Sequence, residues 1–446
     1  MNLLKKFKHK TQGLSNHEIA QEIKRVLKAR FIHRFRRVRY KLLGTEISDR
    51  KLKASLAPDY KNDDQLLVYF KQRQTPSIFW GVERAEETAK TISEFSVTFI
   101  DETLQIADEV CNHTFYFLGH THIYQKLDWF YDCTNGYSWP KSHYSEIVLS
   151  NAKPGSDVKI PWELARLQHA VCLGQAYCLT ANEKYSQEFC LQVRSFYEEN
   201  PPEVGIHWLS PMEVALRAVN LSVGFYFFRA SKSFDLATLK SMLKIVFSHA
   251  KFIEENLERS VRITSNHYLS DLVGLLFIGI LFPEFKRAKK WREFALSEIL
   301  KEMDKQVYSD GVDWEASIGY HALVLELFLY SFLLCKVNKI DIERRYWDKL
   351  AKMFLFVKAY IKPDNTAPLI GDWDDGRVFI WKNRHTTDHS YLLSIAAIIY
   401  EDERFKVTGF PAEESIWIFG QQGYETFENI GTEQQAERSA AFPEAG

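Results

Sequence analysis

The 446-residue sequence lacks the charge excess and the cysteine patterns that would assign a function class at once. Its 57 Lys and Arg against 58 Asp and Glu give a formal net charge of −1, so the molecule as a whole is not suited electrostatically to nucleic acid. Its 6 cysteines form no C-x-x-C pair and show no His/Cys ligand spacing. This pattern argues against a zinc site and against a disulfide framework, and no metal or cofactor is expected.

Long apolar runs are also missing. The longest, residues 272–282, is too short to span a bilayer and has Asp271 and Glu284 near its ends. The basic residues 1–10 are followed by the polar segment 11–16, so the sequence shows no recognisable signal peptide. We therefore expect no membrane span, and the cytoplasm is the location that the sequence alone favours.

Apolar residues are plentiful outside such runs. The apolar fraction is 46% and the aromatic fraction is 14%, with 11 Trp and 21 Tyr. This is ample for a large core, and it also suits carbohydrate binding. The length allows more than one domain or one large helical unit.

The first 150 residues divide into two expected regions. Residues 1–44 are strongly basic, and a helix is predicted from Ser15 onward. Its arginines either touch an anionic polymer or a membrane surface, or pack on an acidic body: Arg34, Arg36, Arg37 and Arg39. Residues 45–150 are predicted to be irregular. Within them His120 and His122 are a weak metal signal, and the aromatic loop 128–140 is either a sugar platform or a lid on the core.

From Pro161 a regular helical periodicity begins. It predicts helices at 161–180, 183–199, 211–231, 235–258, 266–282, 285–308, 313–336 and 341–361. They pair as hairpins whose first members start 50, 55 and 47 residues apart. A helix-pair unit recurring at this period predicts an all-α fold in which residues 151–430 form an (α/α) toroid.

In such a toroid the inner helices point their starts at one cleft. Each predicted inner helix begins with polar or aromatic residues before it turns apolar, and Asn266 with His267 opens the most apolar of them. The other cleft candidates are Trp162, Glu163, Arg166, His169, Glu213, Arg217, Asn220, Glu315, Tyr320, His321, Asp372 and Trp373. Glu213 and Arg217 are expected to form an i,i+4 ion pair. The simpler interpretations are that Asn266 caps its helix and that His267, Tyr320 and His321 are ordinary core residues.

Two chemistries fit these candidates. Hydrolysis needs two carboxylates, for which Asp313, Glu315, Asp372 and Asp374 are available. Lyase chemistry on a uronic acid needs donors that neutralise the sugar carboxylate, together with a base and an acid. Asn266 suits the first role, and Tyr320 suits the second if His321 or Arg217 lowers its pKa.

Five stretches in this order resemble the heparinase II/III family, in particular its heparinase III-like branch of bacterial polysaccharide lyases: 159–169, 212–220, 266–269, 314–321 and 371–377. The resemblance covers about residues 110–420. It implies an incomplete toroid followed by a C-terminal β-sandwich, and β-elimination with Asn266 neutralising the uronate, His267 assisting and Tyr320 acting as acid. An acidic polysaccharide, heparin-like or an exopolysaccharide, would be the substrate, and the periplasm the location.

The sequence departs from the family at its C-terminus. Residues 431–446 are expected to be the first strand of a β-sandwich that is otherwise missing, together with a catalytic histidine that the family places there. We therefore expect a chain that keeps the sugar cleft and lacks part of the catalytic set. The alternative is a carbohydrate-binding toroid without catalysis. The uronic acid, the linkage, endo or exo action and the oligomeric state cannot be read from the sequence.

Overall fold

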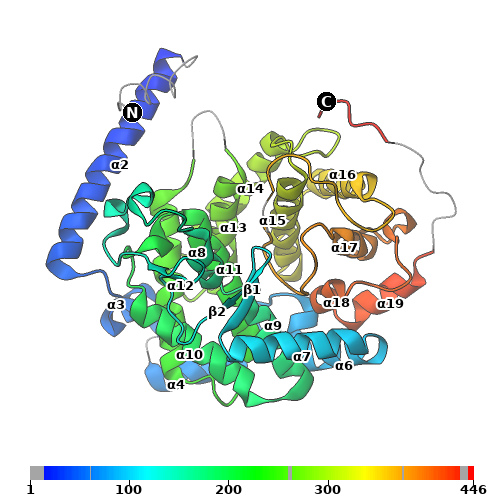
Figure 1. The fold of residues 1–446 in the computed structure, drawn as a ribbon, viewed down its shortest axis with the longest axis horizontal. Coiled ribbons are helices and arrows are strands. Elements are labelled where there is room, and N and C mark those ends of the chain that lie inside the picture. The colour runs from blue at the N-terminus through cyan, green and yellow to red at the C-terminus, as the bar shows by residue number, and fades with distance from the viewer. Residues whose placement is uncertain (1–14, 61, 260–263, 374–375, 432–439, 446) are drawn as a thin grey trace.

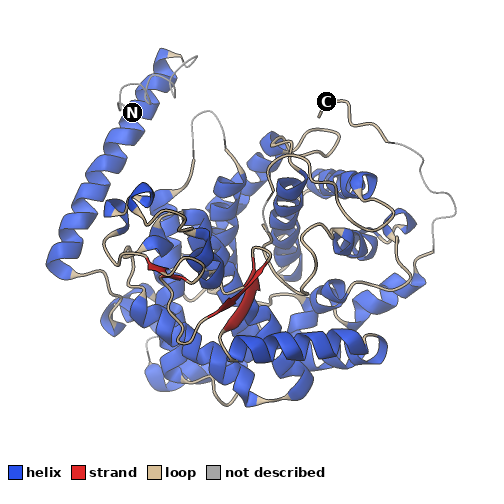
Figure 2. Cartoon of the chain, viewed as in Figure 1, coloured by secondary structure: helices blue, strands red, loops and turns tan. Residues whose placement is uncertain are grey.

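The computed structural model describes residues 15–60, 62–259, 264–373, 376–431 and 440–445. Within this part of the chain the fold is all-α, as predicted, with short β-hairpins as its strands (Figure 2). The hairpins are β1 (Thr114–Phe117) with β2 (His120–Ile123), and β3 (Tyr131–Asp132) with β4 (Tyr137–Ser138), both antiparallel.

Every helix predicted from the periodicity is present. They are α8 (Lys159–Ala165), α9 (His169–Thr180), α10 (Glu183–Glu199), α11 (Pro211–Phe228), α12 (Leu236–Asn256), α13 (Asn266–Leu281), α14 (Ala288–Gln306), α15 (Ile318–Val337) and α16 (Arg344–Tyr360). The first predicted helix is broken in two, because Leu167 adopts a left-handed conformation with φ of 57° between α8 and α9.

These helices form an inner and an outer row. Helices α9, α11, α13 and α15 pack side by side as the inner row, and α10, α12, α14 and α16 return along the outside (Figure 1). The inner helices α11, α13 and α15 are buried along almost their whole length. The arrangement matches the predicted array of helical hairpins.

The prediction that residues 45–150 are irregular holds for residues 112–150, which form short hairpins and turns, and is wrong for residues 49–111. They hold α3 (Asp49–Ser55), α4 (Asp63–Gln72), α5 (Trp80–Glu83), α6 (Ala85–Phe95) and α7 (Val97–Cys111). These helices close the ring, because α5 and α6 pack on α18 (Glu413–Phe419) while α6 and α7 pack on α9. The helical period was present in the sequence and was missed: α7 buries Phe99, Thr103, Ala107 and Val110 at helical spacing, and α6 buries Thr88, Ala89 and Ile92 on one face.

The aromatic loop and one histidine of the pair, His122, belong to the core, whereas His120 is exposed. Trp129 and Trp139 are buried, so the loop 128–140 is a lid on the core rather than a sugar platform. His122 is buried too, stacks on Phe117 and lies 3.3 Å from the Cys133 thiol.

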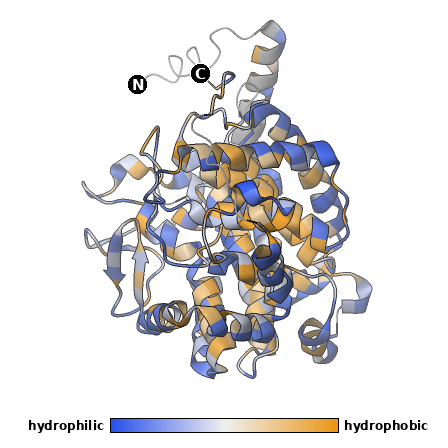
Figure 3. Cartoon of the chain, turned by 90° about the vertical axis from the view of Figure 1, so that its right-hand side faces the viewer, coloured by the Kyte–Doolittle hydropathy of each residue, from blue (hydrophilic) through white to orange (hydrophobic). Residues whose placement is uncertain are grey.

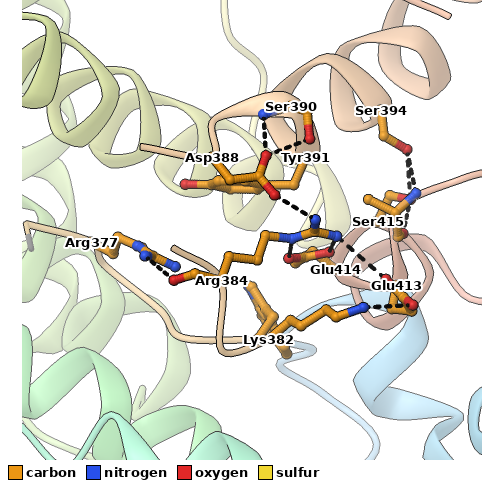
Figure 4. Close-up of polar contacts among 12 residues, drawn as sticks. Arg377, Lys382, Arg384, Asp388, Ser390, Tyr391, Ser394, Glu413, Glu414 and Ser415 are labelled. Atoms are coloured by element: carbon orange, nitrogen blue, oxygen red, sulfur yellow. Dashed lines mark hydrogen bonds and ion pairs between the residues drawn. The ribbon is translucent and has the colours of Figure 1, made fainter. Parts of the chain in front are cut away.

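The C-terminal part adds α17 (Ser390–Tyr400), α18 and α19 (Gln421–Asn429). A polar network ties the loop before α17 to the start of α18 (Figure 4). At its centre Arg384 binds the carboxylates of Asp388 at 2.9 Å and of Glu414 at 3.0 Å. The expected strand at 431–446 falls partly outside the described residues. Those described from 440 to 445 form a turn, and Glu444 accepts from the Ser309 N–H at 2.9 Å.

Apolar residues gather on the helices inside the ring (Figure 3). By length and composition, α15 is the one helix among the described residues that is apolar enough to cross a membrane, and 94% of its apolar segment is buried inside the protein. It is therefore the central core helix of this fold. The sequence-based search missed its length because Glu326 and His321 interrupt the apolar run.

Helix α2 (Asn16–Leu43) is the predicted basic helix and runs out from the body (Figure 1). Two of its arginines pack on acidic residues of the body: Arg36 donates to Glu255 at 2.5 Å and Arg39 to Glu203 at 3.0 Å. Arg34 and Arg37 are exposed. The interpretation that the helix packs on an acidic body therefore holds for Arg36 and Arg39, and contact with an anionic polymer or membrane stays a prediction.

Candidate active site

The starts of the inner helices converge, as the sequence pattern predicted. Contacts join the first turn of α11 to the end of α8, and the first turn of α13 to the loop before α15. Glu258, which follows α12, links the first turns of α11 and α13 by accepting from the Met212 N–H and pairing with His267. The candidate site is therefore one continuous cluster of polar side chains at one end of the inner row.

Asn266 is the first residue of α13 and is engaged by a carboxylate. Its side-chain Nδ2 donates to Glu315 Oε1 at 2.9 Å and Oε2 at 3.1 Å, and its backbone N–H donates to Oε1 at 3.0 Å. The first N–H groups of a helix have no partner within the helix, and the helix dipole favours an anion there. The start of α13 is therefore a carboxylate-binding position, which Glu315 fills in this structure. Asn266 is not the N-cap, because Ser265 occupies that position.

His267 follows Asn266 and is half exposed, with 50% of its side chain accessible. Its Nδ1 lies 3.2 Å from Glu258 Oε2, and this hydrogen bond raises the pKa of the imidazole above its ordinary value. Glu258 is itself held by the Met212 N–H at 3.2 Å and the Ser210 hydroxyl at 3.4 Å. His267 is thus an accessible imidazole beside Asn266, with its charged form favoured by Glu258, and not a core histidine.

Arg166 and Glu213 form a buried ion pair on the other side of the cluster. Arg166 donates through Nε and Nη2 to both Glu213 oxygens at 2.8 Å, and through Nη1 to Glu163 at 2.5 Å. The predicted Glu213–Arg217 pair is therefore wrong. An arginine from α8 reaches Glu213 in the bidentate geometry that suits a carboxylate.

Tyr320 lies in the first turn of α15 and is half buried. Its N–H donates to the Ser317 hydroxyl at 3.2 Å, which caps the helix. Ser317 in turn donates to the backbone oxygen of Asp372 at 2.5 Å. The loop that carries Asp372 is thereby tied to the start of α15, next to Tyr320.

Close packing fixes this loop. Gly371 has a φ of 80°, and a Cβ there would come within 2.7 Å of Ser317 Cα. The Trp373 ring lies parallel to the His389 ring, with 5.6 Å between the ring centroids. The His389 Nδ1 is hydrogen-bonded to the Tyr360 hydroxyl at 2.8 Å. Burial lowers the pKa of His389 to about 4, so it is a neutral platform. No sequence pattern marks His389 as a site residue, because its contact with Trp373 depends on tertiary packing. Asp372 itself is exposed.

Two non-glycine residues next to the cluster have left-handed backbone. Leu167 follows Arg166, and Ala316, with φ of 54°, follows Glu315. A left-handed backbone at a non-glycine residue destabilises the fold by on the order of 1–3 kcal/mol, and such residues tend to gather at functional sites. This strain orients the residues that hold Glu213 and Asn266, and it supports the assignment of the cluster as the site.

Some predicted site residues lie in the core instead. Arg217 is 0% exposed and donates to His249 Nε2 and the His207 backbone oxygen, both at 2.9 Å. His321 is buried, with Nε2 3.2 Å from the Met353 oxygen, and burial lowers its pKa to about 4. Both therefore hold helices together, and neither is placed to contact substrate or to act as a cation beside Tyr320.

Of the remaining candidates, three also have partners inside the protein. Trp162 is half buried and donates to the Ile206 oxygen at 3.0 Å. Half-buried His169 pairs with Gln192 at 2.6 Å, and Asn220 donates to the Val378 oxygen at 3.0 Å. These contacts make them framework residues around the cluster.

The carboxylates proposed for hydrolysis are poorly placed for an acid and a base. Asp313 is buried, and burial together with the nearby Glu315 raises its pKa to about 8, so it is neutral at pH 7. Glu315 is bound to Asn266, and Asp372 is exposed on a loop. Asp374 lies outside the described residues. The described geometry therefore favours the donor cluster on α13 over a carboxylate pair.

Comparison with known proteins identifies relatives of this chain. The family model "Heparinase II/III N-terminus" matches residues 50–393. A heparin-sulfate lyase of Pedobacter heparinus is 28% identical over 238 residues, covering 51% of this chain and 35% of that protein. A heparin-sulfate lyase of Bacteroides stercoris is 26% identical over 313 residues, covering 65% of this chain and 44% of that protein. This chain thus spans less than half the length of these relatives.

Solved structures share the fold. A crystal structure of heparinase III superposes with a TM-score of 0.56 at 19% identity, covering 80% of this chain and 54% of that one. The heparan sulfate lyase HepC from Pedobacter heparinus gives a TM-score of 0.54 at 22% identity, covering 83% and 54%. At these identities the likeness concerns the fold alone.

Proposed function

This chain belongs to the heparinase II/III family, and from that premise we propose that it binds a uronic-acid-containing polysaccharide and cleaves it by β-elimination. The observation that carries the proposal is the start of α13. There the Asn266 amide and N–H already hold a carboxylate, that of Glu315, beside the half-exposed His267, whose pKa is raised by Glu258. A uronate carboxylate has the same chemistry as the Glu315 side chain.

Neutralising the uronate is the first requirement of the reaction. The proton on the carbon next to the carboxylate becomes acidic only when the charge that develops on the carboxylate is stabilised. The Asn266 amide donates without adding charge, His267 donates as a cation, and the N-terminus of α13 contributes its dipole. In this mechanism Glu315 yields its place to the substrate, or the substrate shares the donors with it.

Proton transfer is the second requirement. A base removes the proton, electrons move to form a double bond in the sugar ring, and the glycosidic oxygen leaves with a proton from an acid. We assign the acid to Tyr320, which stands at the start of the helix next to α13. The product is one chain end with an unsaturated uronate and one new reducing end.

The substrate class follows from the relatives together with the site. The relatives carry the name heparin-sulfate lyase, so a heparan-like glycosaminoglycan is the first substrate to test, and an exopolysaccharide rich in uronic acid is the second. A periplasmic location is a further proposal, which fractionation of the source cells would test.

The test is an assay for unsaturated uronate, followed by its ultraviolet absorbance, with each polysaccharide. We expect Asn266→Ala to lower the turnover rate by about 100-fold to 1,000-fold, the usual effect of removing one donor to a developing oxyanion. Asn429→Ala, at the end of α19, is the matched control and should keep the full rate. Saturated products, or full activity of Asn266→Ala with an unchanged circular dichroism spectrum, would contradict the proposal.

A second candidate, binding of acidic glycan without cleavage, is favoured by one observation. The Asn266 donors are occupied by Glu315, so the cluster is stable without a substrate. This candidate predicts binding in titration calorimetry without any product, and binding that Tyr320→Phe leaves unchanged.

A further inference from the structure

Helix α2 is fixed to the body by one side of its C-terminal part. Arg36 donates to Glu255 at 2.5 Å and to Asn256 at 2.8 Å, and Arg39 donates to Glu203 at 3.0 Å. The rest of the helix extends away from the ring of helices (Figure 1). The opposite side of α2 is therefore available to a partner.

That opposite side carries apolar side chains in a helical pattern. Leu27 is 59% exposed, Phe35 62% and Leu42 75%, and the exposed Ile23 and Val38 belong to the same set. Their spacings of 4, 8, 3 and 4 residues place them within about 120° of the helix circumference at 3.6 residues per turn. Large apolar side chains aligned on one exposed face mark a binding surface.

Basic residues share this face. Lys24, Arg34 and Lys41 are exposed and fall within the same arc, since Arg34 and Lys41 lie 7 and 14 residues after Leu27. The sequence of α2 contains nine Lys and Arg against two Glu, so the face is cationic overall. Arg37 and Lys41 share one ion-pair partner, Glu146, at 3.8 and 3.7 Å.

A cleft of about 690 Å³ opens beside Phe35 where α2 meets α12 and α14. Its cationic lining residues are Arg36, Arg39, Lys251 and Arg287, and its acidic ones are Glu254 and Glu255. The two carboxylates are already bound, Glu255 by Arg36 and Glu254 by Arg287 and Lys290. Half-exposed Lys251 and exposed Arg287 extend the cationic surface from the helix onto the body.

We propose that the outer face of α2 docks on an anionic lipid surface. Apolar side chains enter the boundary of the acyl chains, while the long Lys and Arg side chains reach back to the headgroup phosphates. A helix of this kind lies on the membrane, in agreement with the absence of a predicted span. The proposal does not depend on the catalytic assignment.

The mixture of apolar and basic side chains decides between lipid and other partners. A sulfated or uronate glycan would engage the basic residues and leave Leu27, Phe35 and Leu42 in water. A second copy of this chain would bring its own cationic α2 against this one, which like charges oppose. An anionic bilayer satisfies both kinds of side chain at once.

The experiment is co-sedimentation of the full chain with two kinds of vesicle, pure phosphatidylcholine and an equal mixture of phosphatidylcholine and phosphatidylglycerol. We expect binding to the mixed vesicles and little to the neutral ones, with binding that weakens as salt is added. Absence of binding to the mixed vesicles would overturn the proposal.

Two variants separate the contributions. The apolar variant combines Leu27→Gln, Phe35→Gln and Leu42→Gln, and the basic variant combines Lys24→Gln, Arg34→Gln and Lys41→Gln. We expect each variant to weaken binding by about tenfold or more, because an interfacial helix depends both on the burial of apolar side chains and on attraction to anionic lipids. The matched control combines Val68→Gln, Val97→Gln and Leu191→Gln, which are similarly exposed apolar residues on other helices, and should bind as the wild type does.

The variants also test the other occupants. If the apolar variant binds mixed vesicles as well as the wild type, α2 is only a cationic helix and the lipid proposal is wrong. If sedimentation velocity without vesicles shows a dimer that the apolar variant abolishes, the face is an interface between copies and the proposal is likewise wrong. Circular dichroism of each variant confirms that the fold is intact.

Discussion

Helices α11 and α13 lie side by side and share a sequence pattern, yet they use their polar residues differently. Each begins with polar side chains and continues as an apolar run. In α13 the polar residues Asn266 and His267 are the first and second of the helix, and His267 reaches solvent. In α11 Arg217 is the seventh residue and is fully buried.

Depth along the helix explains the difference. Each residue advances a helix by about 1.5 Å, so the seventh residue lies about 9 Å below the first. That distance carries Arg217 out of the cleft and into the layer where helices pack. Direction around the helix explains a second difference, in α15. Tyr320 is the third residue of this helix and buried His321 is the fourth, and adjacent residues point about 100° apart.

The largest expected effect tests the Tyr320 and His321 pair. Tyr320→Phe should lower turnover of a uronate polysaccharide by about 100-fold to 10,000-fold, because it removes a proton donor. Its thermal stability should stay close to that of the wild type. Exposed Tyr116→Phe, on β1, is the matched control. A Tyr320→Phe enzyme with normal turnover would end the assignment of the acid.

Arg217→Met should act on stability instead. It leaves the His249 ring nitrogen and the His207 oxygen without their donor inside the core. We expect the free energy of unfolding, measured in urea, to fall by about 3 kcal/mol. The KM of the folded fraction should stay unchanged. A rise in KM without loss of stability would return Arg217 to the cleft.

Glu258→Gln should change the pH dependence of activity. The hydrogen bond that Glu258 accepts from His267 raises the pKa of His267, so the cationic form persists to a higher pH in the wild type. Activity that needs this cation is present at low pH and is lost as pH rises through the raised pKa. In Glu258→Gln the falling limb should move to lower pH, with a loss below about tenfold at neutral pH. Exposed Glu293→Gln is the control, and an unmoved limb would show that the charge of His267 has no role.

Asp313→Asn should have the smallest effect on turnover. The folded-state pKa of Asp313 is raised to about 8, above its ordinary value of 3.8, so the folded protein holds a proton that the unfolded chain releases. Stability from this group is therefore present at low pH and lost as pH rises toward 8. The amide should remove this slope from melting curves recorded between about pH 4 and pH 8. If Asp313→Asn instead abolishes turnover, the hydrolase alternative gains support.

The sequence predicted the helices of the inner and outer rows well, because residues facing a core at every third or fourth position leave a strong period. It also placed Asn266, His267 and Tyr320 at helix starts. The helices of residues 45–150 were missed although α7 buries Phe99, Thr103, Ala107 and Val110 at helical spacing, so that part of the fold was readable from the sequence. Pairings such as Arg166 with Glu213 and Trp373 with His389 could not be predicted, because they join residues that the chain brings together only through tertiary packing.

The central claim is that the start of α13 binds a sugar carboxylate. The most direct measurement is titration calorimetry of the Tyr320→Phe variant with a uronate oligosaccharide and with the same oligosaccharide after reduction of its carboxyl groups to alcohols. We predict binding of the first and at least a tenfold weaker binding of the second, as expected for loss of a charge-assisted contact. Equal affinity for the two ligands would contradict the account.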